Sequence, residues 1–537
     1  MEIFSVKNLS FTYPQTDKKA LNNISFSVKS GEFCVICGQS GCGKTTLLRM
    51  LKPQSAPHGE KSGEILFCSK NINSCTEQET AFKIGYVSQN PEAQIVTDTV
   101  LHELAFMLEN MGMSSDEIDI RISETATYFG LSKIIEQKTT ALSGGQMQLL
   151  NLAAASVAEP EVLILDEPAS QLDPVSAENF FTILDKLNKD LGITVIITEH
   201  RLENLFPIAD RVIVMEQGRI ITDTAPKECS AKLCSISQNH PMLSAMPVPV
   251  RLYSATESKK PCPITVKEGR GLFAELCRAD FAIDKKENLS YNSQNEILSV
   301  KNIFFRYDKK SDDVLSQLSL SVNKGEIFSV VGANGSGKST LLSVIGSRLK
   351  PYRGRVNVKE KTAIMPQNPL FLFTKDELLE DFKTVSKDAE KINELCKSFN
   401  LINLLKHHPY DLSGGEIQRA AFVKLLLLDP QIILLDEPTK GCDSFSKAEL
   451  AQVLKKLSQK GITILLVTHD LDFSASVSSA CAMLFNGSLS PRLEPHSFYC
   501  GKRFYTTSAN KISRGIKDGI ITAEELILSV KGRKNEI

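Results

Sequence analysis

The chain has 537 residues, enough for roughly three or four domains and for more than one sizeable hydrophobic core. Its 62 basic and 63 acidic residues leave a net charge of −1, so we expect no nucleic acid partner bound over the whole surface. Hydrophobic residues make up 42% and charged residues 23%, ordinary globular values that exclude wholesale disorder.

No stretch of about 18 predominantly apolar residues occurs, so no segment is predicted to span a bilayer. The first residues, Met-Glu-Ile-Phe-Ser-Val-Lys-Asn, lack the apolar stretch of a signal peptide. We therefore expect a cytosolic protein whose membrane role, if it has one, comes through partners.

The apolar run Phe33–Cys37 predicts a buried strand. Thirteen cysteines are scattered along the chain, and Cys34 with Cys37 is the only close pair. No second pair or His pair follows at zinc spacing, so the apolar setting favours a strand over a metal site.

A glycine-rich loop follows this run and opens a leucine-rich helical segment. Its glycines let backbone amides surround phosphate oxygens, and the helix N-terminus adds a favourable potential for the anion. Lys44 reaches the β- and γ-phosphates, and Thr45 offers a hydroxyl to Mg²⁺. A chance glycine-rich turn is the alternative for a single loop. The residues assigned to nucleotide here are Gly38, Gln39, Ser40, Gly41, Cys42, Gly43, Lys44, Thr45 and Thr46.

Two further motifs follow in the same region. Leu142-Ser-Gly-Gly-Gln146 precedes an apolar helical segment, where Ser-x-x-Gln also fits a helix capping box. The apolar strand from Val162 ends in Asp166-Glu167-Pro168. This ending places Asp166 beside a metal ion and lets Glu167 polarise an attacking water, although the tripeptide alone also fits a plain turn.

The domain boundaries follow from composition and from an internal repeat. We expect a first domain over 1–235, a connector over 236–294, a second domain over 295–490 and a tail over 491–537. The prolines of the connector rule out a continuous helix there, and the tail holds a short helical segment from Thr522.

The second domain repeats the first. Glu-Ile-Leu-Ser-Val-Lys-Asn at 296–302 matches Glu-Ile-Phe-Ser-Val-Lys-Asn at 2–8, although the stretch between loop and acids is longer in the first copy. Leu412-Ser-Gly-Gly-Glu416 and Asp436-Glu437-Pro438 recur in order. Two loops at matching places leave little room for the chance-turn reading. The second nucleotide loop comprises Gly332, Ala333, Asn334, Gly335, Ser336, Gly337, Lys338, Ser339 and Thr340.

In each copy, apolar strands alternate with helical segments, which predicts an α/β fold with a largely parallel sheet. The Leu-Ser-Gly-Gly motif, lying between a phosphate loop and strand-end acids, resembles the signature of ABC ATPases. The resemblance implies two tandem P-loop domains, each with a RecA-like α/β core, an antiparallel β subdomain and a helical subdomain, and an ATPase that uses ATP and Mg²⁺. The signature residues are Ser143, Gly144, Gly145, Gln146, Ser413, Gly414, Gly415 and Glu416.

In that family, the signature amides approach the γ-phosphate bound by the opposite domain. The resemblance therefore implies two composite sites. Lys44, Asp166 and Glu167 would work with Ser413 and Gly415. Pairing within one chain and pairing across a homodimer both stay open.

The converse site would join Lys338, Asp436 and Glu437 to Ser143 and Gly145. The departures from the family pattern are Glu416, which adds a negative charge, and the second D-loop, which reads Gly-Cys-Asp-Ser. We therefore expect two competent but unequal sites.

Other positions match the family in pairs. Gln89 and Gln367 resemble the glutamine that senses Mg²⁺ and the γ-phosphate, and Asp173 and Asp443 resemble the D-loop aspartate. His200 and His469 resemble the switch histidine, and Tyr13 and Tyr307 the ring that stacks on adenine; a structural histidine and a core tyrosine are the alternatives. The resemblance implies catalytic residues Glu167, Glu437, His200 and His469. The implied metal set is Thr45, Gln89, Asp166, Ser339, Gln367 and Asp436.

The segment after Gln89, Asn-Pro-Glu-Ala-Gln-Ile-Val-Thr-Asp-Thr-Val-Leu-His-Glu-Leu-Ala-Phe, resembles the ATPases of energy-coupling-factor importers of vitamins and of cobalt or nickel. Glu199-His-Arg-Leu-Glu resembles their fused two-cassette branch. The resemblance implies two partners, a transmembrane coupling protein and a substrate-binding membrane subunit, and a peripheral place on the cytoplasmic side of the membrane. Alternatively, Ile95, Val96 and Val100 fill the core of the helical subdomain.

Two other functions of two-cassette proteins fit the sequence less well. A soluble two-cassette ABC mechanoenzyme that acts on ribosomes would have a long charged helical connector, which the proline-rich connector contradicts. Fused sugar-importer ATPases show a degraded second phosphate loop, whereas the loop from Gly332 is intact.

Overall fold

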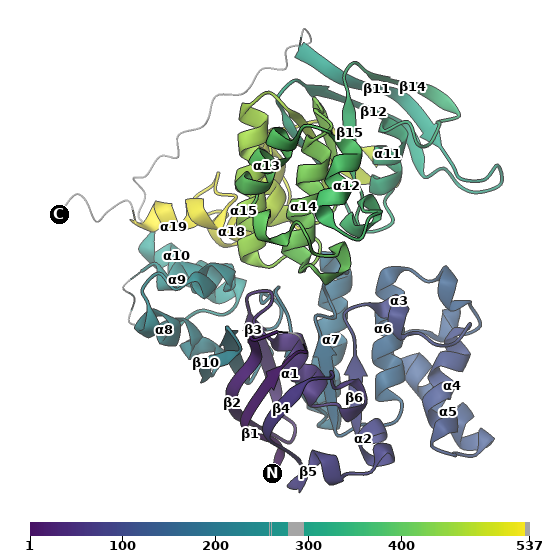
Figure 1. The fold of residues 1–537 in the computed structure, drawn as a ribbon, viewed down its shortest axis with the longest axis vertical. Helices are drawn as coiled ribbons and strands as arrows, with labels where there is room; N and C mark the ends of the chain where they lie inside the picture. Colours follow the sequence, from purple (N-terminus) through teal and green to yellow (C-terminus); the bar gives the residue numbers. More distant parts are fainter. Residues whose placement is uncertain (15, 257, 259, 278–294, 532–537) are drawn as a thin grey trace. The chain divides into compact units, whose positions relative to one another are not determined.

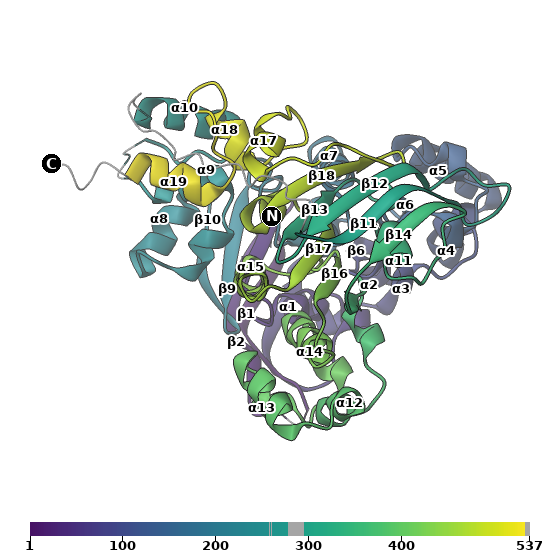
Figure 2. The same ribbon diagram turned by 90° about the horizontal axis from the view of Figure 1, so that it is seen from above.

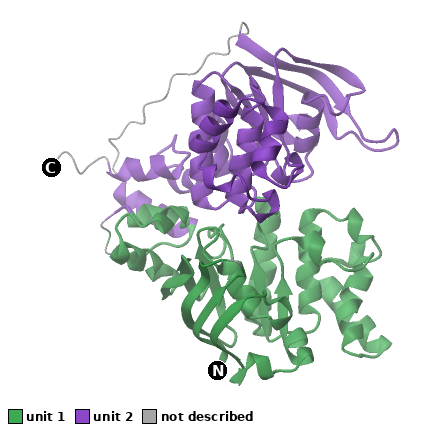
Figure 3. Cartoon of the chain, in the orientation of Figure 1, with its two compact units in different colours: residues 1–254, 258–265 green, residues 255–257, 266–537 purple. Residues whose placement is uncertain are grey.

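The structure is a computed structural model that describes residues 1–531 apart from 15, 257, 259 and 278–294. The chain divides into two compact units (Figure 3), residues 1–254 with 258–265 and residues 255–257 with 266–537. Residues 278–294 of the predicted connector and 532–537 of the predicted tail lie outside the described residues.

The first unit is built on a six-stranded sheet. Its strands, in spatial order, are β10 (Arg219–Thr224), β9 (Arg211–Glu216), β3 (Phe33–Gly38), β8 (Thr194–Thr198), β7 (Val162–Asp166) and β6 (Ile84–Val87). Neighbouring strands are parallel except β9 and β10. Strands β3, β7 and β8 are buried throughout, as expected for a parallel sheet covered on both faces, and β3 buries the thiols of Cys34 and Cys37.

A second, antiparallel sheet completes the β part of this unit. Its order is β2 (Lys19–Lys29), β1 (Glu2–Thr12), β4 (Glu60–Phe67) and β5 (Lys70–Asn71). Buried and exposed side chains largely alternate along β1 and β2, so one face packs on the core while the other meets solvent. Phe4 and Phe11 of β1 share a core cluster with Leu47 and Leu48 of the first loop's helix.

The helices of the first unit flank the six-stranded sheet or form a separate group. Helices α4, α5 and α6 lie side by side (Figure 1). The helices are α1 (Lys44–Met50), α2 (Glu77–Lys83), α3 (Pro91–Gln94), α4 (Val100–Asn110), α5 (Ser115–Tyr128), α6 (Gly144–Ser156), α7 (Pro174–Leu191), α8 (Pro226–Ile236) and α9 (Val248–Ser254).

The second unit repeats both sheets (Figure 2). The antiparallel sheet has the order β12 (Leu315–Asn323), β11 (Glu296–Phe305) and β14 (Arg353–Val358). The six-stranded sheet has the order β15 (Thr362–Met365), β16 (Ile432–Asp436), β17 (Thr463–Thr468), β13 (Ile327–Val331), β18 (Ala480–Phe485) and β19 (Ser488–Leu489). Its neighbours are parallel apart from β18 and β19. The strand order therefore matches the first unit.

The helices of the second unit include parts of the predicted connector and tail. Helix α10 (Val266–Leu276) packs against α18 (Ser508–Ser513). The others are α11 (Lys338–Ile345), α12 (Leu378–Val385), α13 (Ala389–Ser398), α14 (Gly414–Leu426), α15 (Ser444–Gln459), α16 (Leu471–Val477), α17 (Pro495–Cys500) and α19 (Ala523–Lys531).

Each unit thus has an α/β core, an antiparallel sheet and a group of helices inserted between the second and third core strands in chain order, which confirms the predicted fold class. In both units, the glycine-rich loop, the strand-end acids and the histidine follow the carboxyl ends of neighbouring parallel strands. These ends meet at one edge of the sheet, where α/β proteins bind their ligands.

Candidate functional site

The glycine-rich loops join β3 to α1 and β13 to α11. Lys44 is buried, and its Nζ donates to the carbonyl oxygens of Gly38 (2.9 Å) and Gln39 (3.1 Å). The ammonium group of Lys338 makes the matching bonds to the second loop, both 2.9 Å long. Each loop therefore wraps around its own lysine.

Glycine is required where the first loop enters its helix. Gly43 has φ 102°, and a Cβ atom there would lie 2.4 Å from the carbonyl oxygen of Ala20. Gly337 repeats this conformation with φ 100°. The backbone therefore keeps a shape that other residues cannot adopt without strain.

The strand-end aspartates lie beside these loops but differ in their partners. In the first unit, Asp166 Oδ1 accepts from Thr45 Oγ1 (3.1 Å) and from Thr198 Oγ1 (2.8 Å). In the second, buried Oδ1 of Asp436 has no hydrogen-bond partner among the described residues. Burial raises the pKa of both carboxyl groups.

Glu167 and Glu437 follow the aspartates in a left-handed backbone conformation, with φ 44° and 47°. Such a conformation is costly for a residue with a side chain and persists only where the surroundings hold it. The amide of Glu167 donates to the carbonyl oxygen of Thr198 (3.0 Å), and that of Glu437 to the carbonyl oxygen of Val467 (2.9 Å). The neighbouring strand therefore holds the backbone of each glutamate in place.

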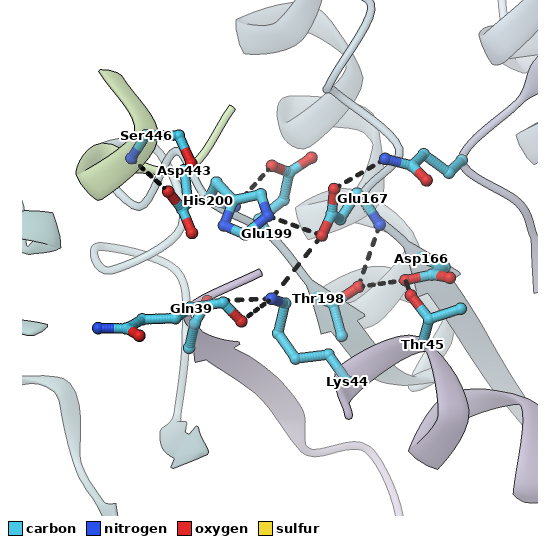
Figure 4. Close-up of polar contacts among 12 residues, drawn as sticks. Gln39, Lys44, Thr45, Asp166, Glu167, Thr198, Glu199, His200, Asp443 and Ser446 are labelled. Carbon is cyan, nitrogen blue, oxygen red and sulfur yellow. Dashed lines mark hydrogen bonds and ion pairs between the residues drawn. The ribbon is translucent and has the colours of Figure 1, made fainter. Parts of the chain in front are cut away.

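In the first unit, three side chains converge on Glu167 (Figure 4). His200 Nε2 lies 2.8 Å from Glu167 Oε1, and Lys44 Nζ lies 3.9 Å from the same oxygen. Gln89 Nε2 donates to Glu167 Oε2 at 2.9 Å. The structure therefore brings the predicted glutamate, histidine, lysine and glutamine together.

In the second unit, a lysine and a histidine contact the carboxylate of Glu437. Lys338 Nζ lies 3.3 Å from Oε1, while His469 reaches Oε2 with Nδ1 (3.0 Å) and with its amide (3.1 Å). Burial by itself would raise the pKa of Glu437, but His469 and Lys338 hold it below its usual range. Exposed Gln367 makes no side-chain hydrogen bond to Glu437 in the described structure, unlike Gln89 in the first unit.

The two predicted adenine-stacking tyrosines occupy matching places. Tyr13 and Tyr307 lie at the ends of β1 and β11, and each hydroxyl is 3.0 Å from a threonine hydroxyl, of Thr46 and Thr340 respectively. Tyr307 is 63% exposed, whereas Tyr13 is half-buried and packs against the core. Both tyrosines therefore lie beside the loop helices.

The signature residues form helix caps. Ser143 and Ser413 are the N-caps of α6 and α14, and both make the predicted capping box. Glu416 Oε2 accepts from the amide (2.8 Å) and the hydroxyl (2.6 Å) of Ser413, whereas Gln146 Oε1 accepts from the amide of Ser143 (2.9 Å). Glu416 therefore directs its negative charge at its own cap.

The signature does not join its own unit's phosphate loop. Among the described residues, the side chains of Ser143 and Gln146 bond only to each other's backbone. A Cβ atom on Gly145 would lie 3.3 Å from Ser176 Oγ, and Ser176 in turn bonds to the D-loop residue Asp173. The equivalent aspartate of the second unit, Asp443, caps α15 in the same way. Signature and D-loop therefore adjoin within each unit.

Two residues at the centre of the first site are not among the predicted site residues. Thr198 bonds to Asp166, and buried Glu199 accepts from two backbone amides. A carboxylate directly after an apolar strand, where the second copy has Thr468, is the signal that could have identified Glu199.

No helix in the described ranges combines the length and the apolar character that crossing a membrane requires. The ABC transporter family model matches residues 21–170 and 315–440. An ABC transporter ATP-binding protein of Bacillus cereus is 38% identical over 95% of this chain and 94% of its own length.

A Bacillus subtilis protein named as an HMP/thiamine import ATP-binding protein, YkoD, is 30% identical over 91% of both chains. Among solved structures, the archaeal ribosome recycling factor aABCE1, in complex with the ribosomal stalk protein aP1, matches with a TM-score of 0.58. The match covers 91% of this chain and 90% of that one at 21% identity, which shows a shared fold alone.

Proposed function

The chain belongs to the ABC transporter family as an ATPase with two tandem cassettes, and from this premise we propose that it powers import. In this proposal, it is the ATP-hydrolysing subunit of an energy-coupling-factor-type importer. A vitamin or a transition-metal ion passes through separate membrane subunits, which hold the chain at the cytoplasmic side of the membrane. The two cassettes comprise residues 1–235 and 295–490.

The observation that carries the proposal is the segment after each predicted Q-loop glutamine. Val100 of this segment is fully buried, but Val96 is 70% exposed, and Phe371 at the matching loop is 77% exposed. Exposed apolar side chains that cluster on a surface mark contacts with a partner. Leu101 and Phe106 of α4 add further partly exposed apolar surface.

Hydrogen bonds to a buried carboxylate hold the segment in place in each unit. Buried Glu103 accepts from the amides of Val96 (3.1 Å) and Thr97 (2.9 Å) and from the hydroxyl of Thr97 (2.8 Å). Asp381 accepts from the amide and hydroxyl of Thr374 in the second unit, both at 3.2 Å. A rigid apolar loop suits the transmission of a conformational change to a membrane partner.

Relatives support import over the alternative. The YkoD protein, named for HMP/thiamine import, aligns with nine-tenths of this chain. The resemblance to the ribosome recycling factor is one of fold and leaves function open. The proline-rich connector also argues against the ribosomal role.

Hydrolysis follows from the groups at each strand end. Glu167 and Glu437 orient the attacking water and accept its proton, and the neighbouring histidines hold these carboxylates in place. Lys44 and Lys338 exchange their loop carbonyl partners for phosphate oxygens. Tyr13 and Tyr307 present a ring face to the adenine.

The residues present fit Mg²⁺. Buried Asp436 Oδ1 has no hydrogen-bond partner among the described residues, and a hard cation takes such an oxygen. We assign Ser339, Asp436 and Gln367 to the ion in the second cassette, and Thr45, Asp166 and Gln89 in the first. When bound, Mg²⁺ offsets the charge on the phosphates.

We further infer that each signature serves the opposite cassette's nucleotide. The support is that Ser143 and Gln146 bond within their own helix cap, away from the loop lysine of the same unit. Backbone amides at a helix N-terminus bind an anion well. The mass of the ATP-bound species in solution distinguishes pairing within one chain from pairing between two copies.

Affinity purification of the tagged chain from native membranes tests the import role. We expect integral membrane subunits to copurify, and recovery of ribosomes in their place would overturn the proposal. Val96→Glu with Phe371→Glu should abolish this recovery, since a charge on each loop opposes an apolar contact.

A control variant separates docking from folding. Ile120→Glu alters a 67% exposed apolar residue on α5 of the same group of helices. It should leave copurification intact, and both variants should keep the ATP turnover of the isolated chain. Equal loss of membrane subunits in the two variants would contradict a specific docking loop.

A further inference from the structure

Glu199 is a buried carboxylate that the hydrolytic arrangement leaves without a role. It directly follows β8, is 1% exposed, and precedes the switch residue His200. A carboxylate is almost never fully buried unless it is paired or hydrogen-bonded. Its position within the described structure therefore calls for a specific partner.

Its two oxygens join two separate turns of the chain. Oε1 accepts from the amide of Ala169 at 2.6 Å, and Oε2 accepts from the amide of His200 at 3.1 Å. Ala169 is two residues beyond Glu167, so Glu199 links the turn that carries the glutamate to the turn that carries the histidine. The contact of 2.8 Å between His200 and Glu167 depends on how these turns are placed.

In the second cassette, the turn that carries the histidine is joined to a helix by other residues. Thr468 stands in place of Glu199, and its hydroxyl accepts from the amide of Asp470 at 3.0 Å. The carboxylate of Asp470 then pairs with Lys447 Nζ at 2.6 Å, on the helix that follows the D-loop. The matching residue to Lys447 in the first cassette is Ala177, which cannot form an ion pair.

We propose that Glu199 is the positioning residue of the first ATP site, tying the turn of His200 to the turn of Glu167, and that in the second site the Lys447–Asp470 pair holds the turn of His469 against α15 instead. Glu199 acts through the histidine and does not touch the nucleotide.

The choice of a carboxylate has a chemical reason. Two buried amides on different turns need two acceptors, and a carboxylate supplies both from one side chain. A threonine hydroxyl is too short to span the turns. Burial and the nearby charge of Glu167 raise the pKa of Glu199 to about 6, so the doubly accepting form is the dominant one at neutral pH.

A double-mutant cycle on the full-length chain tests the proposal. Glu437→Gln is introduced first, so that the remaining turnover depends on Glu167. Glu199→Ala should then lower kcat on the order of 10-fold, below the 10²-fold that a fully misplaced reacting group costs, with KM for ATP unchanged. With His200→Ala already present, Glu199→Ala should have no further effect.

Either of two results overturns the proposal: no loss of turnover while His200 is intact, or the same loss after His200 is removed. Should Glu199→Ala fail to fold, Glu199→Gln takes its place, since it keeps the size and one acceptor and should cost less. Glu199→Ala, Glu199→Gln, His200→Ala and the Glu199→Ala, His200→Ala double variant should also lower turnover in a chain that retains Glu437.

The second cassette supplies the matched control. In a chain carrying Glu167→Gln, Lys447→Met should lower turnover while His469 is present and should have no effect after His469→Ala. Glu199→Ala should have no effect on turnover in that chain. A loss there would show that Glu199 does not act on the first site alone.

Discussion

The two cassettes pair the same strands in the same order, yet their strand-end aspartates meet different neighbours. Asp166 lies opposite Thr198, whose hydroxyl donates to Oδ1. Asp436 lies opposite Val467, whose side chain has no hydrogen-bond donor. In the second site, a buried carboxylate oxygen therefore has no hydrogen-bond partner among the described residues, while in the first the matching oxygen accepts from two hydroxyl groups. One fold thus carries two sites with different resting states.

The difference extends to the glutamates. Glu167 is shared among lysine, histidine and glutamine, while Glu437 is held by lysine and by both the ring and the amide of one histidine. Four experiments break or sharpen this comparison.

The largest expected effect is on stability and concerns Asp381, the buried acid that follows the second Q-loop glutamine. Asp381 is fully buried and pairs with Lys424 Nζ at 2.6 Å, whereas the first cassette has Ala154 at the lysine position. Lys424→Met should lower the free energy of unfolding by about 3–5 kcal/mol, because it leaves an uncompensated buried charge. Urea unfolding of the full chain measures this.

A surface ion pair provides the control. Lys391 pairs with Asp429, which is 74% exposed, so Lys391→Met should cost less than about 1 kcal/mol. If Lys424→Met and Lys391→Met lowered the free energy of unfolding by similar amounts, a buried ion pair would not be what holds the segment after Gln367.

The next effect is on turnover. Glu167→Gln and Glu437→Gln should each slow hydrolysis by ~10²–10³-fold at their own site, as the loss of a group that acts in the transition state does. Because the two carboxylates have different partners, the two losses should differ. The steady-state ATP turnover that remains in each variant reports the site left intact, and equal remaining turnover in the two variants would contradict unequal sites.

A smaller effect depends on pH. Glu199 has its pKa raised from 4.5 to about 6 by burial and by Glu167, while His200 and Arg201 oppose the shift. The fold therefore favours the protonated form, and stability is lost as pH rises from 4.5 through 6.

That loss is about 2 kcal/mol, and Glu199→Gln should abolish it. Urea unfolding at pH 4.5 and 7.5 checks the sign. The variant should gain stability relative to the parent chain at the higher pH. A gain at the lower pH would mean that the charged form is the favoured one.

The smallest effect is expected at the signatures. Glu416 adds a charge at a helix N-terminus where the first cassette has Gln146. Glu416→Gln should tighten ATP binding at the site that this signature serves by a factor corresponding to about 0.3–1 kcal/mol, because it removes a negative charge near phosphate. Equilibrium binding of ATP measures it.

The reciprocal change, Gln146→Glu, should weaken binding at the other site to a similar extent. Both capping boxes are kept, so folding should not change. The same sign for the two substitutions would rule out an electrostatic origin.

Local sequence was sufficient for the fold class because the determining features are local or repeated. Apolar runs predicted the core strands, the loop glycines predicted the lysine cradle, and the duplication made each motif confirm the other. The ABC family and the ATPase activity follow from the same motifs. The roles of individual site residues and the domain limits stay predictions.

Only the tertiary structure decided how each site is held together. Thr198 meets Asp166 because β7 and β8 are parallel neighbours in a particular register, although the two residues are 32 positions apart along the chain. The bond from Glu199 to Ala169 spans a similar distance in sequence and depends on the same register. By itself, the sequence determined that there are two phosphate loops of one family; the packing of strands far apart in the chain determined that the glutamates at the strand ends are fastened in two different ways.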